Sequence, residues 1–262
     1  MQLHSRTPRD PRLCGLVRSL WHCRAPDARG QARMLPSGTM QLIVNLNSDA
    51  LRHADLIGGE VAVRSGAVIQ GMHTRAVVLD RADQRDVLGV VFEPGAGRVL
   101  LGTPLDALAH THVDLFELTR GEAPLREQLV GASPEDCFDR TERWLRARIQ
   151  GEVDRTIHAA LGLMQRGEQR VAVLASEVGT SERSLRRRFR AEVGLPPKQM
   201  SRVLRLQRAL EGLCGTSPLA DVAHSSGYHD QAHFTHELKE LARISPSEYR
   251  RRRLLSHRSH LR

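Results

Sequence analysis

Apolar residues between positions 171 and 193 recur at the spacing of two short helices joined by a sharp turn. The first helix would bury a face made of four residues that lie three or four positions apart: Val171, Leu174, Ala175 and Val178. Gly179 suits the turn because glycine tolerates a left-handed backbone. Ser181 can cap a second helix whose inner positions are Leu185 and Phe189. This segment therefore has the pattern of a helix-turn-helix.

The same pattern returns between positions 219 and 241. Its apolar positions again have helical spacing: Leu219, Val222, Ala223, Phe234, Leu238 and Leu241. Gly227 supplies the turn, and Asp230 supplies the cap of the second helix. A short apolar helix, a glycine turn and a capped second helix form the arrangement that places one helix in a DNA groove. Two such units in register favour a protein that reads DNA.

A longer predicted helix, opening at Pro196 and Pro197, separates the two units. Its apolar residues lie at helical spacing: Val203, Leu206, Leu210 and Leu213. About 17 residues at ~1.5 Å each would span roughly 25 Å. With its flanking turns, this spacer would hold two recognition helices about one duplex turn apart, roughly 34 Å. A capping box at residues 245–248 predicts the start of a last helix.

The first half of the chain shows short strand-like runs separated by glycine or charged turns. The runs cover residues 40–46, 61–63, 67–70, 76–79 and 87–92. They predict a small antiparallel sheet or barrel. Residues 1–35 have a single apolar patch, and we expect them to be loosely structured.

Beyond residue 94 the pattern becomes helical, most strongly at residues 134–149. Ser133 is the expected cap of that helix, and Pro134 takes its first position. We therefore predict an α+β fold with a boundary near Gly151. A β-rich domain of residues 1–150 would precede a helical domain of residues 151–262.

The net charge of +9 is distributed unevenly between these halves. Residues 1–150 carry 19 Lys and Arg against 18 Asp and Glu, a net charge of +1, whereas residues 151–262 carry 20 against 12, a net charge of +8. The excess lies where both helix-turn-helix patterns lie, as contact with phosphate requires. An aromatic content of 3% argues against a base-stacking platform for single strands.

Four arginines share the outward arc of the first recognition helix, opposite its apolar side: Arg183, Arg186, Arg187 and Arg190. An ordinary solvated helix surface mixes acids with bases, whereas here Glu182 occupies the first turn, where the helix dipole favours an acid. Arginine binds guanine through two hydrogen bonds or pairs with phosphate. We count Ser181 and these four arginines as DNA-binding residues.

The second recognition helix differs chemically. Its first turn and outward arc hold Gln231, Ala232, His233, His236, Lys239 and Glu240. Gln231 can bind adenine through two hydrogen bonds, or it is an ordinary polar residue of a first turn. His233 and His236 can donate to phosphate, or they are ordinary surface histidines, and Glu240 would oppose phosphate. We count Gln231, His233, His236 and Lys239 as DNA-binding residues of this helix. This module is predicted to be the weaker of the two.

Residues 153–252 resemble the DNA-binding domain of the AraC/XylS family of bacterial transcription regulators. The likeness is carried by LASEVGTSERSLRRRFRAEVGLPPKQM in the first unit and DVAHSSGYHDQAHFTHELKELARISPSEYR in the second. It implies six base-facing positions: Arg183, Arg186, Arg187, Gln231, Ala232 and His236. The partner that it implies is double-stranded promoter DNA.

Residues 35–149 resemble, more loosely, an N-terminal domain of unknown function that precedes such units in bacterial regulators. LPSGTMQLIVNL, GVVFEPGAGRVLLGTP and RTERWLRARI carry this likeness. It implies that the domain senses an unknown small molecule or dimerises, so the protein is expected to be a monomer or a homodimer. RNA polymerase is a further partner consistent with a regulator of this kind, an activator among them.

The remaining features predict no cofactor and no metal. Four cysteines lack the paired C-x-x-C spacing of a structural zinc site: Cys14, Cys23, Cys137 and Cys214. They are expected to be thiols in a reducing cytosol. No apolar run approaches a transmembrane length, so we expect a cytoplasmic protein with no membrane partner.

Three other functions remain open at this level. His110, His112 and Glu117 have the H-x-H-x4-E spacing of a metal-dependent cupin, although this segment follows a predicted helix instead of lying on a strand. Cys23, which stands between a histidine and an arginine, would be the nucleophile of an alkyl-accepting DNA-repair protein. An architectural protein would bind most duplexes alike. No motif for a catalytic site is recognisable, and we expect no enzyme.

Overall fold

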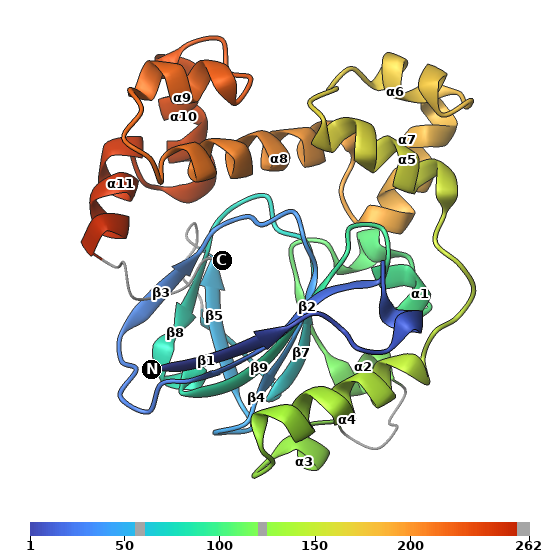
Figure 1. The fold of residues 1–262 in the computed structure, drawn as a ribbon, viewed down its shortest axis with the longest axis vertical. Coiled ribbons are helices and arrows are strands. Elements are labelled where there is room, and N and C mark those ends of the chain that lie inside the picture. The colour runs from blue at the N-terminus through green and yellow to red at the C-terminus, as the bar shows by residue number, and fades with distance from the viewer. Residues whose placement is uncertain (56–60, 120–124, 256–262) are drawn as a thin grey trace.

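Two antiparallel sheets make up most of the first half of the chain in the computed structural model, which describes residues 1–55, 61–119 and 125–255 (Figure 1). The larger sheet contains, in spatial order, β1 (Gln2–Arg6), β2 (Val17–Arg24), β9 (Asp86–Phe92), β4 (Gln41–Asn45), β7 (Ala67–Gln70) and β10 (His112–Asp114). The smaller sheet contains β3 (Gln31–Met34), β8 (Val77–Asp80), β5 (Leu51–Asp55) and β6 (Val61–Arg64). The predicted antiparallel sheet is therefore confirmed.

The core of this half joins the larger sheet to the helices that follow it. Leu42 and Val44 alternate along β4 and are completely buried. Phe138 and Leu145 reach the same apolar cluster from α4 (Pro134–Arg146), which lies within the helix predicted at residues 134–149. The shorter helical segments of this half are η1 (Pro11–Leu13), η2 (Arg81–Gln84), α1 (Gly97–Leu101), η3 (Leu105–Leu108), α2 (Leu115–Leu118) and α3 (Leu125–Leu129).

The expectation that residues 1–35 are loosely structured is wrong. They form β1, β2 and β3, and β2 pairs with β9, which lies far away in the sequence. Leu20 of β2 is completely buried, and the ring of Trp21 covers Gly89 so closely that a Cβ atom there would lie 2.1 Å from it. Because these partners are distant in sequence, no local pattern reveals this strand. The strand β5, which pairs with β6 and β8, was also not predicted.

Seven helices follow in the described part of the second half: α5 (Arg155–Gln165), α6 (Val171–Glu177), α7 (Glu182–Val193), α8 (Pro197–Gly212), α9 (Leu219–Ser225), α10 (Gln231–Ala242) and α11 (Pro246–Leu255). They form two modules, with α5, α6 and α7 at one end of α8 and α9, α10 and α11 at the other (Figure 1). Met200 and Val203 join the first module's apolar cluster, and Leu206 and Leu210 join the second's. The α+β fold class is confirmed.

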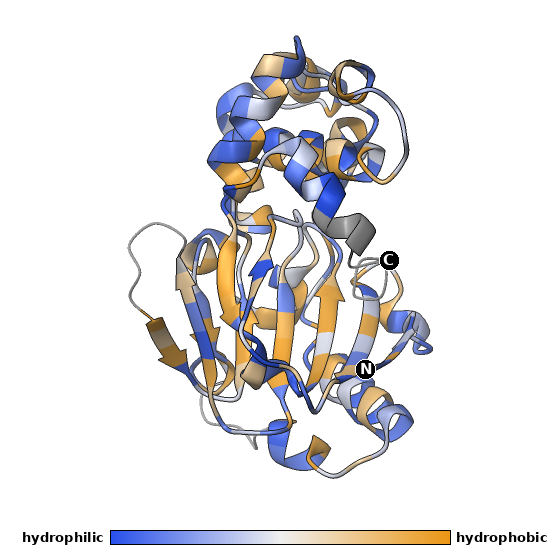
Figure 2. Ribbon diagram, turned by 90° about the vertical axis from the view of Figure 1, so that its left-hand side faces the viewer, coloured by the Kyte–Doolittle hydropathy of each residue, from blue (hydrophilic) through white to orange (hydrophobic). Residues whose placement is uncertain are grey.

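Apolar residues run along the strands, whereas the helices show apolar and polar residues side by side (Figure 2). This contrast is expected, because a helix on the surface of a domain buries one stripe only. In β7 and β9 of the larger sheet every residue is buried or half-buried, so these two strands are covered on both faces.

The β-rich half contacts both helical modules. The Arg98 guanidinium pairs with the Glu192 carboxylate at the end of α7. On the second module, the backbone N–H of Ala76 donates to the carbonyl of Leu241 at 2.7 Å. Met72 belongs to the apolar cluster of the first module. These contacts place the β-rich half directly beneath the helices (Figure 1).

Candidate nucleic-acid interface

The first recognition helix, α7, starts and ends as its sequence predicts. The Ser181 hydroxyl accepts a hydrogen bond from the backbone N–H of Ser184 at 3.2 Å, which caps the helix. Gly179 has φ of +66° in the preceding turn. Leu185 and Phe189 are completely buried against the module's core. With this side fixed inward, the opposite side of α7 faces solvent.

The four predicted arginines all lie on that exposed side of α7: Arg183, Arg186, Arg187 and Arg190. Arg186 pairs with Glu182 one turn earlier, at 2.7 Å. Within the described residues the other three have no ion-pair partner. Arg188, by contrast, turns inward and pairs with Asp154 at 2.6 Å. The helix thus separates arginines with a structural partner from arginines that keep their donors available.

The second recognition helix, α10, begins at a well-formed cap. The Asp230 carboxylate accepts from the backbone N–H of His233 at 2.7 Å. This bond, with a further one from the His229 ring, holds the pKa of Asp230 below its usual range. The predicted residues of this helix are exposed: Gln231, Ala232, His233, His236 and Lys239. The His233 ring stands edge-on to the buried Tyr228, with ring centres 5.3 Å apart, so this histidine also supports the turn.

Glu240 was expected on the outward arc of the second recognition helix, and this expectation is wrong. It is half-buried and pairs with Arg202 of α8 at 2.8 Å, on the side of α10 that faces the β-rich half. Helical spacing fixes the angle of Glu240 around α10, but it carries no information about the position of α8. Because α8 packs beside α10, it covers the side on which Glu240 lies. Glu240 therefore does not oppose phosphate on the recognition surface.

A buried charge network that the sequence analysis missed holds α10 against α8. The Glu237 carboxylate, 6% exposed, accepts hydrogen bonds from Arg205 at 2.8 Å and from Arg202 at 3.1 Å. Burial alone would raise the pKa of Glu237, but the bonds and charges of Arg205 and Arg202 outweigh it and hold the pKa below its usual range. The Arg205 guanidinium also lies 4.7 Å from the centre of the Tyr228 ring. The sequence signal that could have revealed this network was Glu237 itself, a glutamate on the apolar side of the predicted helix, next to Leu238.

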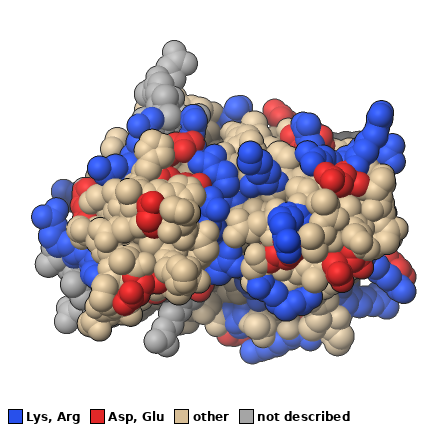
Figure 3. All heavy atoms as spheres, turned by 90° about the horizontal axis from the view of Figure 1, so that it is seen from above, with Lys and Arg blue, Asp and Glu red and all other residues tan. Residues whose placement is uncertain are grey.

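Basic side chains lie on both modules and in the strip between them when the helical half is viewed from above (Figure 3). Acidic side chains stand among them, so the surface is mixed and not uniformly positive. Charge alone thus does not select the binding face. The capped helices and their exposed outward side chains define the candidate face.

The cupin-like motif is divided between two different places. His112 does lie on a strand, β10, contrary to the expectation, and it is 5% exposed. His110 lines a cavity beside α8, whereas Glu117 lines another cavity beside α2. Within the described ranges, no group of three or more His, Cys, Asp or Glu residues is arranged to hold a metal ion.

Histidines from separate segments do gather around His112. Its ring centre lies 3.8 Å from that of His53 and 5.1 Å from that of His73. Burial, together with the charges of the neighbouring His53, His73 and Arg64, lowers the pKa of His112 to about 2. His112 is therefore neutral across the physiological range of pH.

Cys23 lacks the surroundings of an alkyl-accepting nucleophile. The residue is 6% exposed within β2, and burial raises the pKa of its thiol. Its neighbour His22 is engaged by the Asp86 carboxylate at 2.6 Å. A buried, protonated thiol is a poor nucleophile. In the part of the chain that the structure describes, no helix has the length and apolar character needed to cross a membrane.

Comparisons with known protein families assign both halves. Residues 174–252 match a family model described as a helix-turn-helix domain. Residues 5–114 match a model described as a domain of unknown function, DUF6597. The second match begins within β1, so it includes the N-terminal strands that the sequence pattern did not predict.

A curated protein and a solved structure are similar to parts of this chain. A putative AraC-like transcription regulator from Streptomyces antibioticus is 31% identical over 107 residues, which are 39% of this chain and 35% of that protein. The match thus spans about a third of the length of this curated relative. An AraC-type DNA-binding protein from Chromobacterium violaceum is 26% identical, with a TM-score of 0.37, over 38% of this chain and 94% of that structure.

A longer but more distant likeness extends over both halves. A variant of apo ToxT from Vibrio cholerae is 12% identical, with a TM-score of 0.49, over 88% of this chain and 96% of that structure. The two family matches and the curated relative together confirm the resemblance that the motifs indicated. The chain therefore carries an AraC-type helix-turn-helix domain at residues 174–252 and a DUF6597 domain at residues 5–114.

Proposed function

We propose that this protein binds double-stranded promoter DNA sequence-specifically and regulates transcription. The two recognition helices, α7 and α10, would enter successive major grooves, held apart by α8. The observation that carries the proposal is the outer face of α7, where Arg183, Arg187 and Arg190 are exposed and have no ion-pair partner within the described residues. Such side chains can reach guanine edges or phosphates without breaking an internal contact.

The helix α8 supports this arrangement. Its 16 residues span about 24 Å at ~1.5 Å per residue, and the turns at its ends add to that length. Recognition helices that read one face of a duplex are about 34 Å apart. The Glu237 network fixes α10 on α8, so the second module follows the first as one body.

The site residues that we propose for DNA contact are Ser181, Arg183, Arg186, Arg187, Arg190, Gln231, His233, His236 and Lys239. Arg183, Arg186 and Arg187 would face bases, as would Gln231 and His236. The remaining members would face phosphate, and Ser181 would act at the start of α7, where backbone N–H groups point outward. RNA polymerase would be a partner at the promoter.

The experiment that tests the proposal starts from a pool of random duplexes. The full chain is expected to enrich one sequence, and to bind it 10³-fold or more tightly than a scrambled duplex, an order of magnitude typical of regulators. An architectural protein would instead bind both duplexes alike, with affinity falling steeply as salt rises. Absence of enrichment from the pool would contradict the proposed function.

We further propose that residues 151–262 are the DNA-binding unit and that residues 1–150 sense a small molecule. The apolar clusters of both modules are built mostly from helical residues, with Met72, Ala109 and Leu35 as additions from the β-rich half. Residues 151–262 expressed alone are expected to keep the sequence preference of the full chain, with some loss of stability. A fragment that is unfolded, or that binds every duplex equally, would contradict this division.

A further inference from the structure

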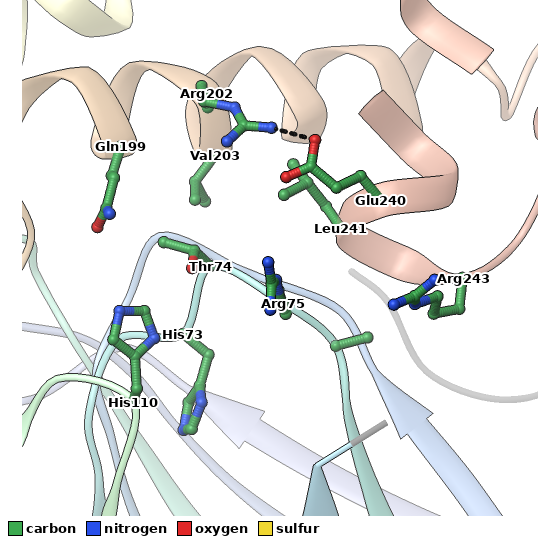
Figure 4. A pocket seen from close by; sticks show the side chains of 11 residues that line it. His73, Thr74, Arg75, His110, Gln199, Arg202, Val203, Glu240, Leu241 and Arg243 are labelled. Atoms are coloured by element: carbon green, nitrogen blue, oxygen red, sulfur yellow. Dashed lines mark hydrogen bonds and ion pairs between the residues drawn. The ribbon is translucent and has the colours of Figure 1, made fainter. Parts of the chain in front are cut away.

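A cavity of about 410 Å³ lies between the β-rich half and the second module (Figure 4). One wall is the segment after β7, with His73, Thr74 and Arg75, together with His110. The other wall comes from α8 and from the end of α10, where Arg243 directly follows the helix. The cavity thus opens beside a recognition helix and is shared by both halves of the chain.

The cavity has more cationic groups than carboxylates to neutralise them. Of its three arginines, Arg202 is already engaged by Glu237 and Glu240. Arg75 and Arg243 have no ion-pair partner within the described residues. Figure 4 shows the Arg243 guanidinium turned toward Arg75 across the cavity. Glu240, the carboxylate that lines the cavity, pairs with Arg202. Two like charges that face one space without a carboxylate partner of their own are the arrangement that an anion stabilises.

Backbone strain points to the same place. Within the described residues, two non-glycine residues have positive φ, His110 at +61° and Arg243 at +53°, and both line this cavity. A helix end in this conformation favours glycine, so an arginine there costs conformational energy. Strained residues cluster at ligand sites, where the side chain they present has a use. The Arg33 guanidinium supports the strained turn by donating to the Arg243 carbonyl at 3.0 Å.

We propose that this cavity binds a small organic anion, whose carboxylate or phosphate group lies between Arg75 and Arg243. The imidazoles of His73 and His110 lie on the same wall as Arg75 and supply further polar contacts. Because Arg75 belongs to the β-rich half and Arg243 to the second module, a bound anion joins the two. It strengthens the existing contact between Ala76 and Leu241 and fixes the end of α10. The regulatory consequence, a change in DNA affinity, rests on the proposed function; the site itself does not.

The test measures anion binding by the full chain without DNA, by calorimetry and thermal unfolding at constant ionic strength. Inorganic phosphate and succinate are the two probes, and sodium chloride is the reference salt. At least one probe is expected to bind, and the probe that binds more tightly identifies phosphate or carboxylate as the preferred group. Failure of both probes to bind above the chloride reference would overturn the proposal.

Variants then locate the site. Arg75→Gln and Arg243→Gln are each expected to weaken binding at least tenfold. Arg29→Gln is the matched control, since Arg29 is exposed, has no ion-pair partner within the described residues and precedes Gln31, at the end of β3 remote from the cavity. Equal binding by the wild type and by either cavity variant would overturn the site, as would an equal loss in Arg29→Gln.

Arg243→Gly separates ligand binding from structural support. Glycine relieves the positive φ, so the unliganded variant is expected to unfold at a higher temperature than the wild type, yet to lose anion binding at least tenfold. A loss of both stability and binding would show that Arg243 only supports the turn. DNA binding is measured last, with and without the anion: unchanged DNA affinity would overturn the regulatory consequence and leave the site standing, whereas absent DNA binding would overturn the proposed function.

Discussion

The two recognition helices share one scaffold and differ in how their outward side chains are used. Both are capped by the residue that the sequence predicts, Ser181 in α7 and Asp230 in α10, and both bury a phenylalanine completely. On α7 the outward face holds arginines, most of them without an internal partner. On α10 it holds shorter polar groups, and the charged residues of the opposite side join α8 instead. A common fold therefore supports a helix with available arginines in one module and a more firmly anchored helix in the other.

Removing the anchor of α10 is expected to give the largest effect. Glu237→Gln leaves the guanidiniums of Arg205 and Arg202 without their buried carboxylate, and breaking such a pair costs about 3–5 kcal/mol. Denaturant unfolding of the full chain measures this loss. The matched control is Glu240→Gln, since Glu240 is half-buried and its pair with Arg202 is partly solvated, so it should cost less than ~1 kcal/mol. Equal losses in the two variants would show that α10 is not anchored through Glu237.

The same anchor predicts an acid sensitivity of the second module. The folded pKa of Glu237 lies below its unfolded value, so its stabilisation is complete above the ordinary glutamate pKa of about 4.3. It is lost as the pH falls through the lower, folded pKa. Comparing the unfolding free energy of the wild type and Glu237→Gln between pH 7 and pH 3 should show their difference shrinking below about pH 4. A difference that stays constant across this range would contradict the assignment.

Most of the helical half could be predicted from the sequence because its determinants are local. Glycine turns, capping residues and apolar spacing act within a few positions, and α7 and α10 begin where these signals put them. The network around Glu237 could not be predicted in the same way. Arg205 and Glu237 meet because α8 and α10 pack together, and spacing within one helix carries no information about its neighbour.

The β-rich half shows the other side of this limit. β4 and β9 were predicted because their apolar runs are strong, whereas β2 becomes a strand through β9, far away in the sequence, and β1 pairs with β2 at the edge of the sheet. The same holds for the cavity near Arg75. Neither Arg75 nor Arg243 stands out in the sequence, and only the packing of the two halves brings them to one space.

A smaller effect is expected at the start of α7, where a substitution should raise the affinity for DNA. Glu182→Gln removes the exposed pair with Arg186, which should cost less than ~0.5 kcal/mol of stability. It also removes a negative charge near the proposed phosphate path and leaves Arg186 available, so DNA affinity should rise modestly at low salt. Fluorescence anisotropy with a short duplex measures the change. A fall in affinity would mean that Glu182 positions Arg186 for DNA and does not withhold it.

The central claim, that α7 contributes more to DNA recognition than α10, is tested most directly by two alanine variants on one duplex. Arg187→Ala and Gln231→Ala are titrated against the enriched sequence and a scrambled one at several salt concentrations. Arg187→Ala should lose about 1–3 kcal/mol on the enriched sequence if it contacts a base, or weaken both duplexes alike and lower the salt slope by about one if it contacts phosphate. Gln231→Ala should lose less in both cases. An equal or larger loss from Gln231→Ala would contradict the account.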